Sequence, residues 1–319
     1  GDAMVDILAM TTPDFLAGEK MANGQMQVIK TEAEARRLED AMVMKQVVAG
    51  GSSANSMAGL AMLGRKAAFI GQVADDDHGG TFVADLARTG VTTPKSTRQT
   101  PPGTGRCLIF VTPDGERTMN TWRGASETLV LSSADETEIA AADTLLLEAY
   151  LWDQSGPRVA MRRAADIAKT AGRRIAFTLA AKRMVENNRA DLLSLMRDGM
   201  IDLLFANEEE ALALMQTSNI DGAVSALRRL VPTSVVTLGQ SGALCATAES
   251  VVTAPAMANV PVVDTTGAGD LFAAGYLAAE SKGEDADTCL RFGAAAAADV
   301  IAQVGARPAK GFASRLEAL

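Results

Sequence analysis

From about residue 140 onward, short apolar runs alternate with longer stretches of helical periodicity. The apolar runs have the length of strands and lie at residues 144–148, 174–179, 203–206 and 234–238. The helical stretches lie at residues 156–171, 185–198, 208–215 and 220–230. This alternation predicts an α/β fold with a mostly parallel sheet and helices on both of its faces.

The first 140 residues follow a less regular pattern. Residues 1–9 are typical of a strand end that carries two carboxylates, Asp2 and Asp6. Residues 10–48 combine an extended piece at 26–29 with a charged helical stretch at 32–44. A helix at 56–63, a strand at 67–73 and a helix at 80–89 are predicted next. The alternating residues 104–124, with a Pro-Asp-Gly turn at 113–115, predict a β-hairpin.

Composition narrows the choice of function. Thirty lysines and arginines against 39 acidic residues give a formal net charge of −9, which disfavours nucleic acid and anionic membranes as partners. One histidine is too few for a multi-histidine zinc site, and no apolar run approaches the ~20 residues of a membrane helix. Three scattered cysteines are typical of a reducing compartment, so we expect a cytoplasmic protein with a small-molecule substrate.

A glycine-rich turn near the C-terminus carries the strongest chemical signal. The chain reads DTTGAGD at residues 264–270, between an apolar strand end and an amphipathic helix. Small residues at a helix N-terminus leave backbone amides open to a phosphate group, here those of Gly267, Ala268 and Gly269. Asp270, in the first helical turn, is placed to accept a proton from an attacking hydroxyl.

The same turn also has a purely structural interpretation. A helix capped by Thr265 or Thr266 after a tight turn needs no ligand. In either interpretation, the helix dipole is expected to lower the pKa of Asp270, so that the carboxylate is ionised at neutral pH.

Other segments offer ligand contacts, again with structural alternatives. GGSSAN at residues 50–55 exposes backbone amides and the Asn55 amide to a polyol, or simply starts a helix. NEEE at 207–210 follows a strand, so its acids either complement the helix dipole or organise Mg²⁺-bound water. TLGQSG at 237–242 ends another strand, as a hairpin turn or as an edge of a nucleotide site. There is no P-loop sequence.

Together and in this order, these segments resemble the ribokinase-like (PfkB) family of sugar and nucleoside kinases, over essentially the whole chain. TPDGERTMNT at residues 112–121 and LEAYLW at 147–152 are similar to the bacterial adenosine-kinase-like branch. The resemblance implies a single ribokinase-like domain over residues 1–319. It would be a three-layer α/β/α domain with a mostly parallel central sheet and a small β-sheet lid, formed by about residues 10–48 and 100–124.

The resemblance also implies residue roles. Asp270 would be the catalytic base, beside an anion hole of Gly267, Ala268 and Gly269. Acceptor hydroxyls would be held by Asp6, Gly51, Asn55 and Glu148. ATP would be bound by Asn207, Glu210, Thr237, Gly239 and Ala294, with Glu210 acting on Mg²⁺ through water. A K⁺ ion would be held near Asp264, Thr266, Val300 and Gln303.

The implied activity is ATP-dependent phosphotransfer to a primary hydroxyl, with adenosine as the leading acceptor and AMP as the product. The alternatives are a free sugar such as ribose, fructose or 2-keto-3-deoxygluconate, and a catalytically silent nucleotide-binding regulator. Two departures from close relatives bear on the acceptor: Asp2 stands where asparagine is usual, and residues 179–188 replace a characteristic segment.

The predicted lid leaves two questions open. Phe15, Met21 and Trp122 are candidates for an apolar platform under a nucleoside base, or else for lid packing. An exposed β lid also offers strand edges that could pair in a homodimer, or the lid simply closes over the substrate.

Overall fold

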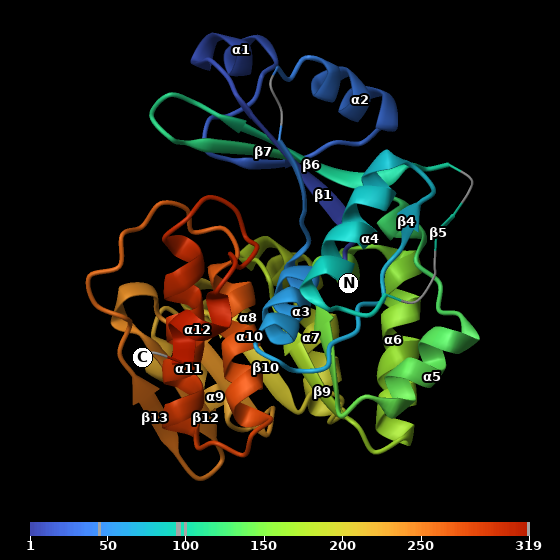
Figure 1. Cartoon of the computed structure of the whole chain (residues 1–319). Coiled ribbons are helices and arrows are strands. Elements are labelled where there is room, and N and C mark those ends of the chain that lie inside the picture. Colours follow the sequence, from blue (N-terminus) through green and yellow to red (C-terminus); the bar gives the residue numbers. More distant parts are fainter. Residues whose placement is uncertain (44–45, 94–96, 99–100, 318–319) are drawn as a thin grey trace.

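The computed structural model of the chain describes residues 1–43, 46–93, 97–98 and 101–317. Among these residues, the strands form a six-stranded sheet, a five-stranded sheet and a two-stranded pair (Figure 1). The predicted helix at 32–44 and the predicted lid ranges include Met44, Lys45 and Thr100, which lie outside the described residues.

The six-stranded sheet is the centre of the molecule. Its order is β13-β12-β11-β10-β9-β8. The bounds are β8 (Thr144–Glu148), β9 (Arg174–Thr178), β10 (Leu203–Asn207), β11 (Thr233–Thr237), β12 (Ala243–Thr247) and β13 (Val251–Ala254). Strands β8 to β11 run parallel, and β12 and β13 are antiparallel additions at one edge. The predicted α/β class with a mostly parallel sheet is therefore confirmed.

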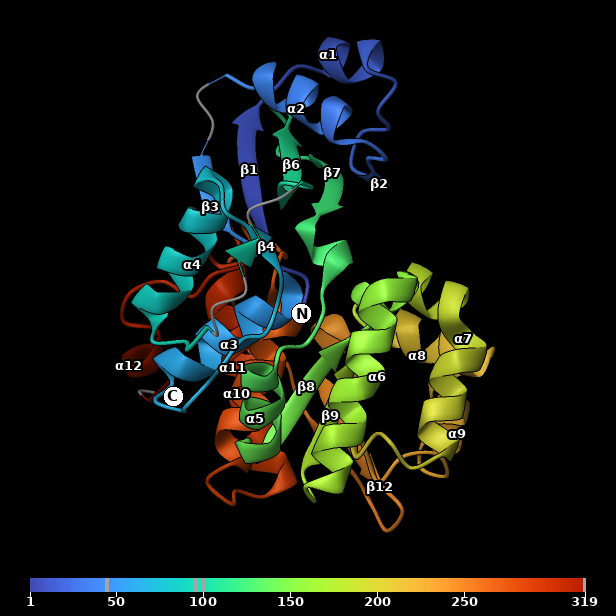
Figure 2. The same ribbon diagram turned by 90° about the vertical axis from the view of Figure 1, so that its right-hand side faces the viewer.

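Helices cover both faces of this sheet, giving three layers (Figures 1 and 2). One layer contains α6 (Ser155–Thr170), α7 (Lys182–Arg197), α8 (Glu208–Met215) and α9 (Ile220–Leu227). The opposite layer contains α3 (Ser52–Met62), α10 (Ala268–Glu280) and α11 (Ala286–Ile301). Shorter or peripheral helices are α5 (Ser133–Ala141), α12 (Phe312–Glu317), η1 (Ala125–Thr128), η2 (Leu151–Asp153) and η3 (Gly239–Ser241).

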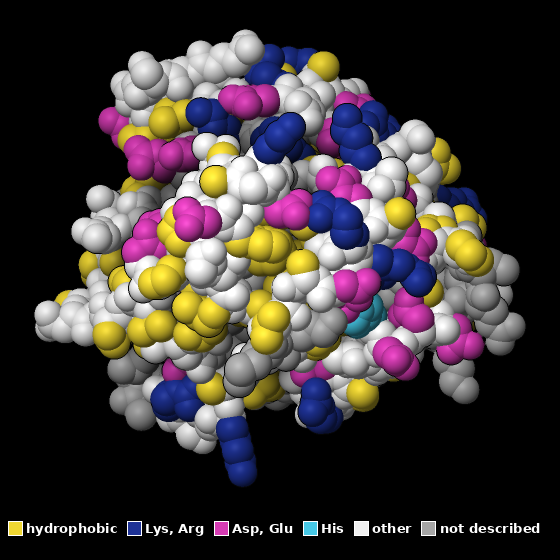
Figure 3. All heavy atoms as spheres, turned by 90° about the horizontal axis from the view of Figure 1, so that it is seen from above, with side chains coloured by type: hydrophobic (Ala, Val, Ile, Leu, Met, Phe, Trp, Pro, Cys, Tyr) yellow, Lys and Arg dark blue, Asp and Glu magenta, His cyan; other side chains and the backbone are white. Residues whose placement is uncertain are grey.

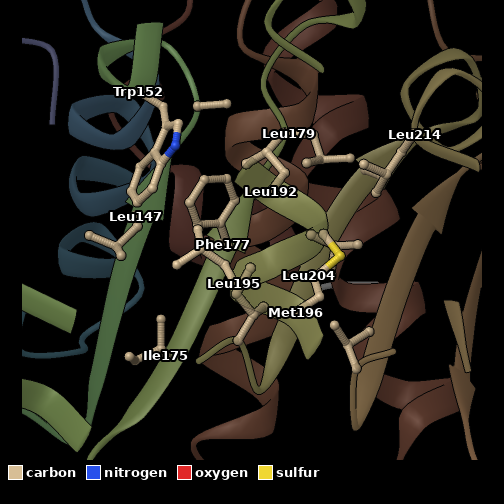
Figure 4. Close-up of a cluster of buried hydrophobic side chains, with 14 of the residues drawn as sticks. Leu147, Trp152, Ile175, Phe177, Leu179, Leu192, Leu195, Met196, Leu204 and Leu214 are labelled. Atoms are coloured by element: carbon tan, nitrogen blue, oxygen red, sulfur yellow. The ribbon is translucent and has the colours of Figure 1, made fainter. Parts of the chain in front are cut away.

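A large hydrophobic core joins the sheet to the α6–α7 layer. Trp152 and Phe177 pack edge to face, with ring centroids 5.7 Å apart. Buried leucines of α7, including Leu192 and Leu195, complete the contact with the strands (Figure 4). The apolar runs that were predicted as strands therefore form the sheet side of this core.

Helices α10 and α11 lie unusually close on the opposite face. A Cβ atom on Gly275 would come within 2.7 Å of the Phe292 carbonyl oxygen and 2.9 Å of Ala296 Cβ. Residues 271–279 are all buried, so the helix predicted to be amphipathic is covered on every side. The prediction was wrong because α3, α11 and the sheet all pack against α10.

The five-stranded sheet stands above the three layers (Figure 1). Its order is β2-β7-β6-β1-β3, with β1 (Met4–Met10), β2 (Met26–Val28), β3 (Gln46–Ala49), β6 (Thr104–Val111) and β7 (Arg117–Gly124). Strands β6 and β7 are antiparallel, which confirms the predicted hairpin. Two short helices, α1 (Pro13–Gly18) and α2 (Glu32–Asp40), accompany it. Because β1 and β3 belong to this sheet, it extends beyond the ranges 10–48 and 100–124.

The strand predicted at residues 67–73 does not form as a continuous strand. Ala68 makes only an isolated bridge to Thr92, and β4 (Val73–Ala74) pairs with β5 (Thr97–Arg98). A cavity of about 930 Å³ is lined by part of this segment, by Gly1 and by residues of β8. The segment is held by Thr92 on one hand and by the Gly1 amino group, which donates to the Ile70 carbonyl at 2.6 Å, on the other. None of the predicted site residues lines the cavity. The next helix, α4, spans Asp77–Thr89.

Charges of both signs are interspersed on the face seen from above the five-stranded sheet (Figure 3). Met10, Met26 and Val28 of this sheet are exposed. The homodimer through this sheet stays a prediction. Among the described residues, no helix is long and apolar enough to span a membrane.

We predict that Gly275→Ala destabilises the fold by about 1–3 kcal/mol, because the added methyl group must push the α11 backbone away. Urea denaturation measures this free energy of unfolding. Gly80→Ala on α4 is the matched control, since nothing lies within 4 Å of the added atom there, and it should not destabilise. Equal effects of the two substitutions would contradict the close packing of α10 on α11.

Candidate active site

The DTTGAGD segment forms a tight turn into α10. Gly267 is the N-cap, with φ +81°, and a Cβ atom there would lie 2.7 Å from Ala306 Cβ. Only glycine meets both demands without strain. The predicted caps Thr265 and Thr266 precede the cap position instead. Asp270 is therefore the third residue of the helix.

The backbone amides of this turn are only partly free. The Ala268 N–H donates to the Thr265 carbonyl at 3.2 Å. Within the described part of the chain, the amides of Gly267 and Gly269 have no hydrogen-bond partner, and the space beside Gly269 Cα is open to at least 4 Å. Open amides at the start of a long helix can accept an anion.

The carboxylate of Asp270 is held by α3. Ser52 Oγ donates to Asp270 Oδ1 at 2.5 Å, and Asn55 Nδ2 donates to Oδ2 at 2.8 Å. Ser56 Oγ also donates to the Asp270 carbonyl at 3.0 Å. The structure thus brings together GGSSAN and DTTGAGD, which lie at opposite ends of the chain.

Burial raises the pKa of Asp270 to about 6, while the hydrogen bonds from Asn55 and Ser52 act in the opposite direction. The expectation of a lowered pKa was wrong, because loss of solvation outweighs the helix dipole at this position. A carboxylate with a pKa near 6 is a stronger base than a solvated one, and it is still largely ionised at pH 7.

Asp6 lies in β1, close to the same centre. The absence of a side chain on Gly50 makes room for its carboxylate, since a Cβ atom there would come within 2.3 Å of Asp6 Oδ1. Burial raises the pKa of Asp6 to about 7, Arg307 lowers it and Asp270 raises it further. The predicted acceptor ligand and the predicted base are therefore close enough to repel one another.

Two arginines near these carboxylates were missed by the sequence analysis. Arg117 Nη1, at the start of β7, lies 2.6 Å from Asp264 Oδ2. Arg307 Nε lies 3.1 Å from Asp85 Oδ2 and influences both Asp6 and Asp270 electrostatically. Isolated arginines in loops or hairpins carry no spacing signal, so only the fold reveals them.

Glu148 and Gly51 support the start of α3. Glu148 is fully buried, and its carboxylate accepts hydrogen bonds from the backbone amides of Asp2 and, at 2.9 Å, Ser53. Gly51 has φ +87°, and a Cβ atom there would lie 2.2 Å from the Asp2 carbonyl oxygen. Both carboxylate oxygens of Glu148 are thus already used by the backbone.

Asn207 and Glu210 form a capping box at the start of α8. Asn207 Oδ1 accepts from the Glu210 N–H, and Glu210 accepts from the Asn207 N–H and Nδ2, at 2.8–2.9 Å. Burial raises the pKa of Glu210 to about 7. Among the described residues, no cluster of three His, Cys, Asp or Glu could hold a metal ion. A single carboxylate, that of Glu210, cannot build a metal cage by itself. It suits a Mg²⁺ ion that arrives bound to the nucleotide and that the protein contacts through water.

Of the other predicted nucleotide residues, Thr237 and Gly239 lie at or just beyond the end of β11, and Ala294 lies in α11. Thr237 at the end of β11 is in register with Asn207 at the end of β10. Gly239 begins η3 with open space beside it, and Ala294 is partly buried in α11. The structure shows no direct contact of these three residues with Asp270.

Two of the four predicted K⁺ ligands, Asp264 and the Val300 carbonyl, accept hydrogen bonds from other groups. Asp264 Oδ1 accepts from the Thr266 N–H and Oγ, and Oδ2 accepts from the Gly305 N–H at 2.6 Å beside Arg117. The Val300 carbonyl accepts from the N–H groups of Ala302 and Gln303. Arg117 already balances the charge of Asp264, whereas among the described residues nothing donates to the carbonyls of Thr266 and Gln303. The K⁺ site therefore stays a prediction, and no step is assigned to that ion.

Comparisons with known proteins identify the family and the fold. A family model described as pfkB family carbohydrate kinase matches residues 21–310. The solved adenosine kinase from Sinorhizobium meliloti is 38% identical, covering 100% of this chain and 97% of that chain, with a TM-score of 0.92. A probable sugar kinase from Rhizobium etli is 36% identical, covering 100% and 96%, also with a TM-score of 0.92. The ribokinase of Haemophilus influenzae is 29% identical over 82% of this chain and 84% of its own length.

These comparisons confirm the predicted family and the predicted enzyme class, a sugar or nucleoside kinase. They do not distinguish a nucleoside from a free sugar as the substrate, since the relatives include both an adenosine kinase and a ribokinase.

We predict that Asp264→Ala destabilises the protein by about 3–5 kcal/mol, because it leaves Arg117 and the Gly305 amide without their buried acceptor. Chemical denaturation measures the loss. Asp287→Ala on α11 removes an exposed pair with Arg291 and should cost under about 1 kcal/mol. If Asp264→Ala costs no more stability than this control, Asp264 does not hold the start of β7 and the Gly305 loop together as described.

Proposed function

The chain belongs to the pfkB family of carbohydrate kinases, and we propose that it transfers the γ-phosphoryl group of ATP to the primary hydroxyl of a nucleoside, adenosine being the first candidate. The single observation that supports this assignment is the Asp270 carboxylate, buried beside open amides and fixed by Ser52 and Asn55.

The proposed reaction uses this geometry directly. The acceptor CH₂OH hydrogen-bonds to Asp270, which takes its proton as the new O–P bond forms. The bond between the γ-phosphorus and the β,γ-bridging oxygen breaks, and its electron pair leaves with ADP. Meanwhile the amides of Gly267 and Gly269 stabilise the charge on the phosphoryl oxygens.

The nucleotide would lie along the strand ends that carry Asn207, Thr237 and Gly239. Mg²⁺ bound to ATP would neutralise charge on the phosphates. Glu210 would orient water in its shell, while Asn207 keeps the Glu210 carboxylate in place through the capping box. Ala294 would lie at the base of the nucleotide.

On the acceptor side, Asp6 and Asn55 would bind hydroxyls of the sugar, with Gly51 and Glu148 holding the start of α3. Met21 and Trp122 are buried in the core of the five-stranded sheet, and Phe15 packs against Phe110 with tilted rings whose centroids are 5.3 Å apart. This favours the packing interpretation of the three over an open platform for a base. Free sugars therefore stay the alternative acceptors.

We infer that the five-stranded sheet acts as the lid, within a single domain. It supplies Asp6 to the acceptor side and places Arg117 on the DTTGAGD turn. A sheet that contributes residues to the site can exclude water when substrate is bound.

An acceptor panel tests the function. The protein is incubated with Mg-ATP and adenosine, other nucleosides, ribose, fructose or 2-keto-3-deoxygluconate, and ADP release is measured with and without K⁺. We expect adenosine to give the highest kcat/KM, and stimulation by K⁺ would support the predicted K⁺ site. If only a free sugar is phosphorylated, that sugar replaces adenosine as the proposed acceptor. If ATP binds but no acceptor is phosphorylated, the proposed kinase activity is contradicted.

We predict that Asp270→Asn lowers kcat by about two to four orders of magnitude with little change in ATP affinity, because the base is lost. In the wild type, kcat should fall as the pH drops through about 6, since a carboxyl of raised pKa is protonated, and inactive as a base, below that value. Steady-state kinetics from pH 5 to 9 check both effects. Exposed Asp287→Asn should keep wild-type kcat, and a variant at Asp270 with normal turnover would refute the assignment.

We predict that Gly269→Val folds normally but loses phosphoryl transfer, because its side chain enters the open space beside the free amide. Thermal denaturation and ADP release are measured together. Gly80→Val on α4, where the space is equally open, should leave turnover intact. Unchanged turnover of Gly269→Val would argue against the amide cradle.

A further inference from the structure

Arg307 is a buried cation with unused donors. All three guanidinium nitrogens are buried, and none meets hydrogen-bond geometry with any described residue. Among the described residues it forms one ion pair, with Asp85 of α4, whose Oδ2 lies 3.1 Å from Nε. Buried donors without acceptors cost free energy, so an oxyanion that reached them would bind favourably.

The loop that carries Arg307 is hydrogen-bonded to the DTTGAGD turn at residues 264–270. Gly305 N–H donates to Asp264 Oδ2, and Gln303 Nε2 donates to the Arg307 carbonyl at 2.8 Å. The neighbouring Ala306 packs against Gly267, the cap of α10. The position of Arg307 is therefore set by the same residues that shape the amide cradle.

The charge balance of the acceptor side calls for such a cation. Asp6 and Asp270 already repel each other there. Transfer would add a phosphate dianion to the acceptor oxygen beside them. Arg307 acts on both carboxylates and is the largest opposing charge on Asp6.

We propose that Arg307 binds the phosphoryl group after it reaches the acceptor oxygen, and so stabilises the monophosphate product against Asp6 and Asp270. This rests on the proposed kinase reaction. Arg307 would then be a catalytic residue that favours transfer from the acceptor side, while the amides of α10 hold the group from the nucleotide side.

The test compares affinities for adenosine and AMP, measured by calorimetry without ATP. In Arg307→Met we expect AMP binding to weaken about 10- to 100-fold, the loss of a charged hydrogen bond, while adenosine binding changes little. Arg315→Met, which removes an exposed arginine paired with Asp299 of α11, is the control and should keep both affinities. An unchanged AMP-to-adenosine ratio in Arg307→Met would overturn the proposal.

A structural role through Asp85 predicts a different pattern. If Arg307 only anchors α4, Asp85→Asn should change the AMP-to-adenosine ratio as Arg307→Met does, and that result would overturn the proposal. We expect Asp85→Asn to lower the melting temperature while keeping the ratio. Should Arg307→Met fail to fold, Arg307→Lys keeps the charge without the planar fork and should show a smaller loss of AMP affinity.

Failure of the proposed kinase function can be distinguished from failure of the Arg307 proposal. If no acceptor in the panel is phosphorylated, inorganic phosphate is added to the protein with Mg-ADP, and its effect on the melting temperature is measured. Stabilisation of the wild type by phosphate, lost in Arg307→Met and kept in Arg315→Met, would support the site on its own. Equal stabilisation of all three proteins would overturn it.

Discussion

The close approach of α3 to α10 is the constraint on which the site depends. A Cβ atom on Gly59 would come within 2.6 Å of Leu271 and 2.8 Å of Ala274, so a larger residue would separate the helices. At this separation, Ser52 and Asn55 reach the Asp270 carboxylate. Packing in the helical layer thereby sets the rotamer of the proposed base, as a positioned catalytic group requires.

Burial then determines the electrostatics. Asp6 and Asp270 lose solvation together, and each pKa rises because protein dipoles and arginines replace only part of the lost water. The arginines come from the segments that close around the carboxylates, the β6–β7 hairpin and the loop after α11. The net charge around the two carboxylates thus depends on how the hairpin and this loop pack against them, which the local sequence does not reveal.

The sequence predicted the features that depend on local chemistry. Strand ends placed Glu148, Asn207 and Thr237 at one edge, because parallel strands align their carboxyl ends there. Asn55 and Asp270 were identified by their motifs. The predictions that were wrong concerned features that depend on residues distant in the sequence. The N-cap of α10 is Gly267, α10 is buried on every side, and the pKa of Asp270 is raised. Arg117 and Arg307 could be found only from the fold, since Arg117 pairs with Asp264 and Arg307 with Asp85, both of which are distant in the sequence.

The contact between Asn55 and Asp270 joins residues 215 positions apart. During synthesis, Asp270 is therefore added long after Asn55, and a product that stops between them has the GGSSAN segment without the proposed base. Long-range contacts of this kind also close late and slow the search for the native state. Phosphotransfer through Asp270 accordingly requires that synthesis has passed the start of α10.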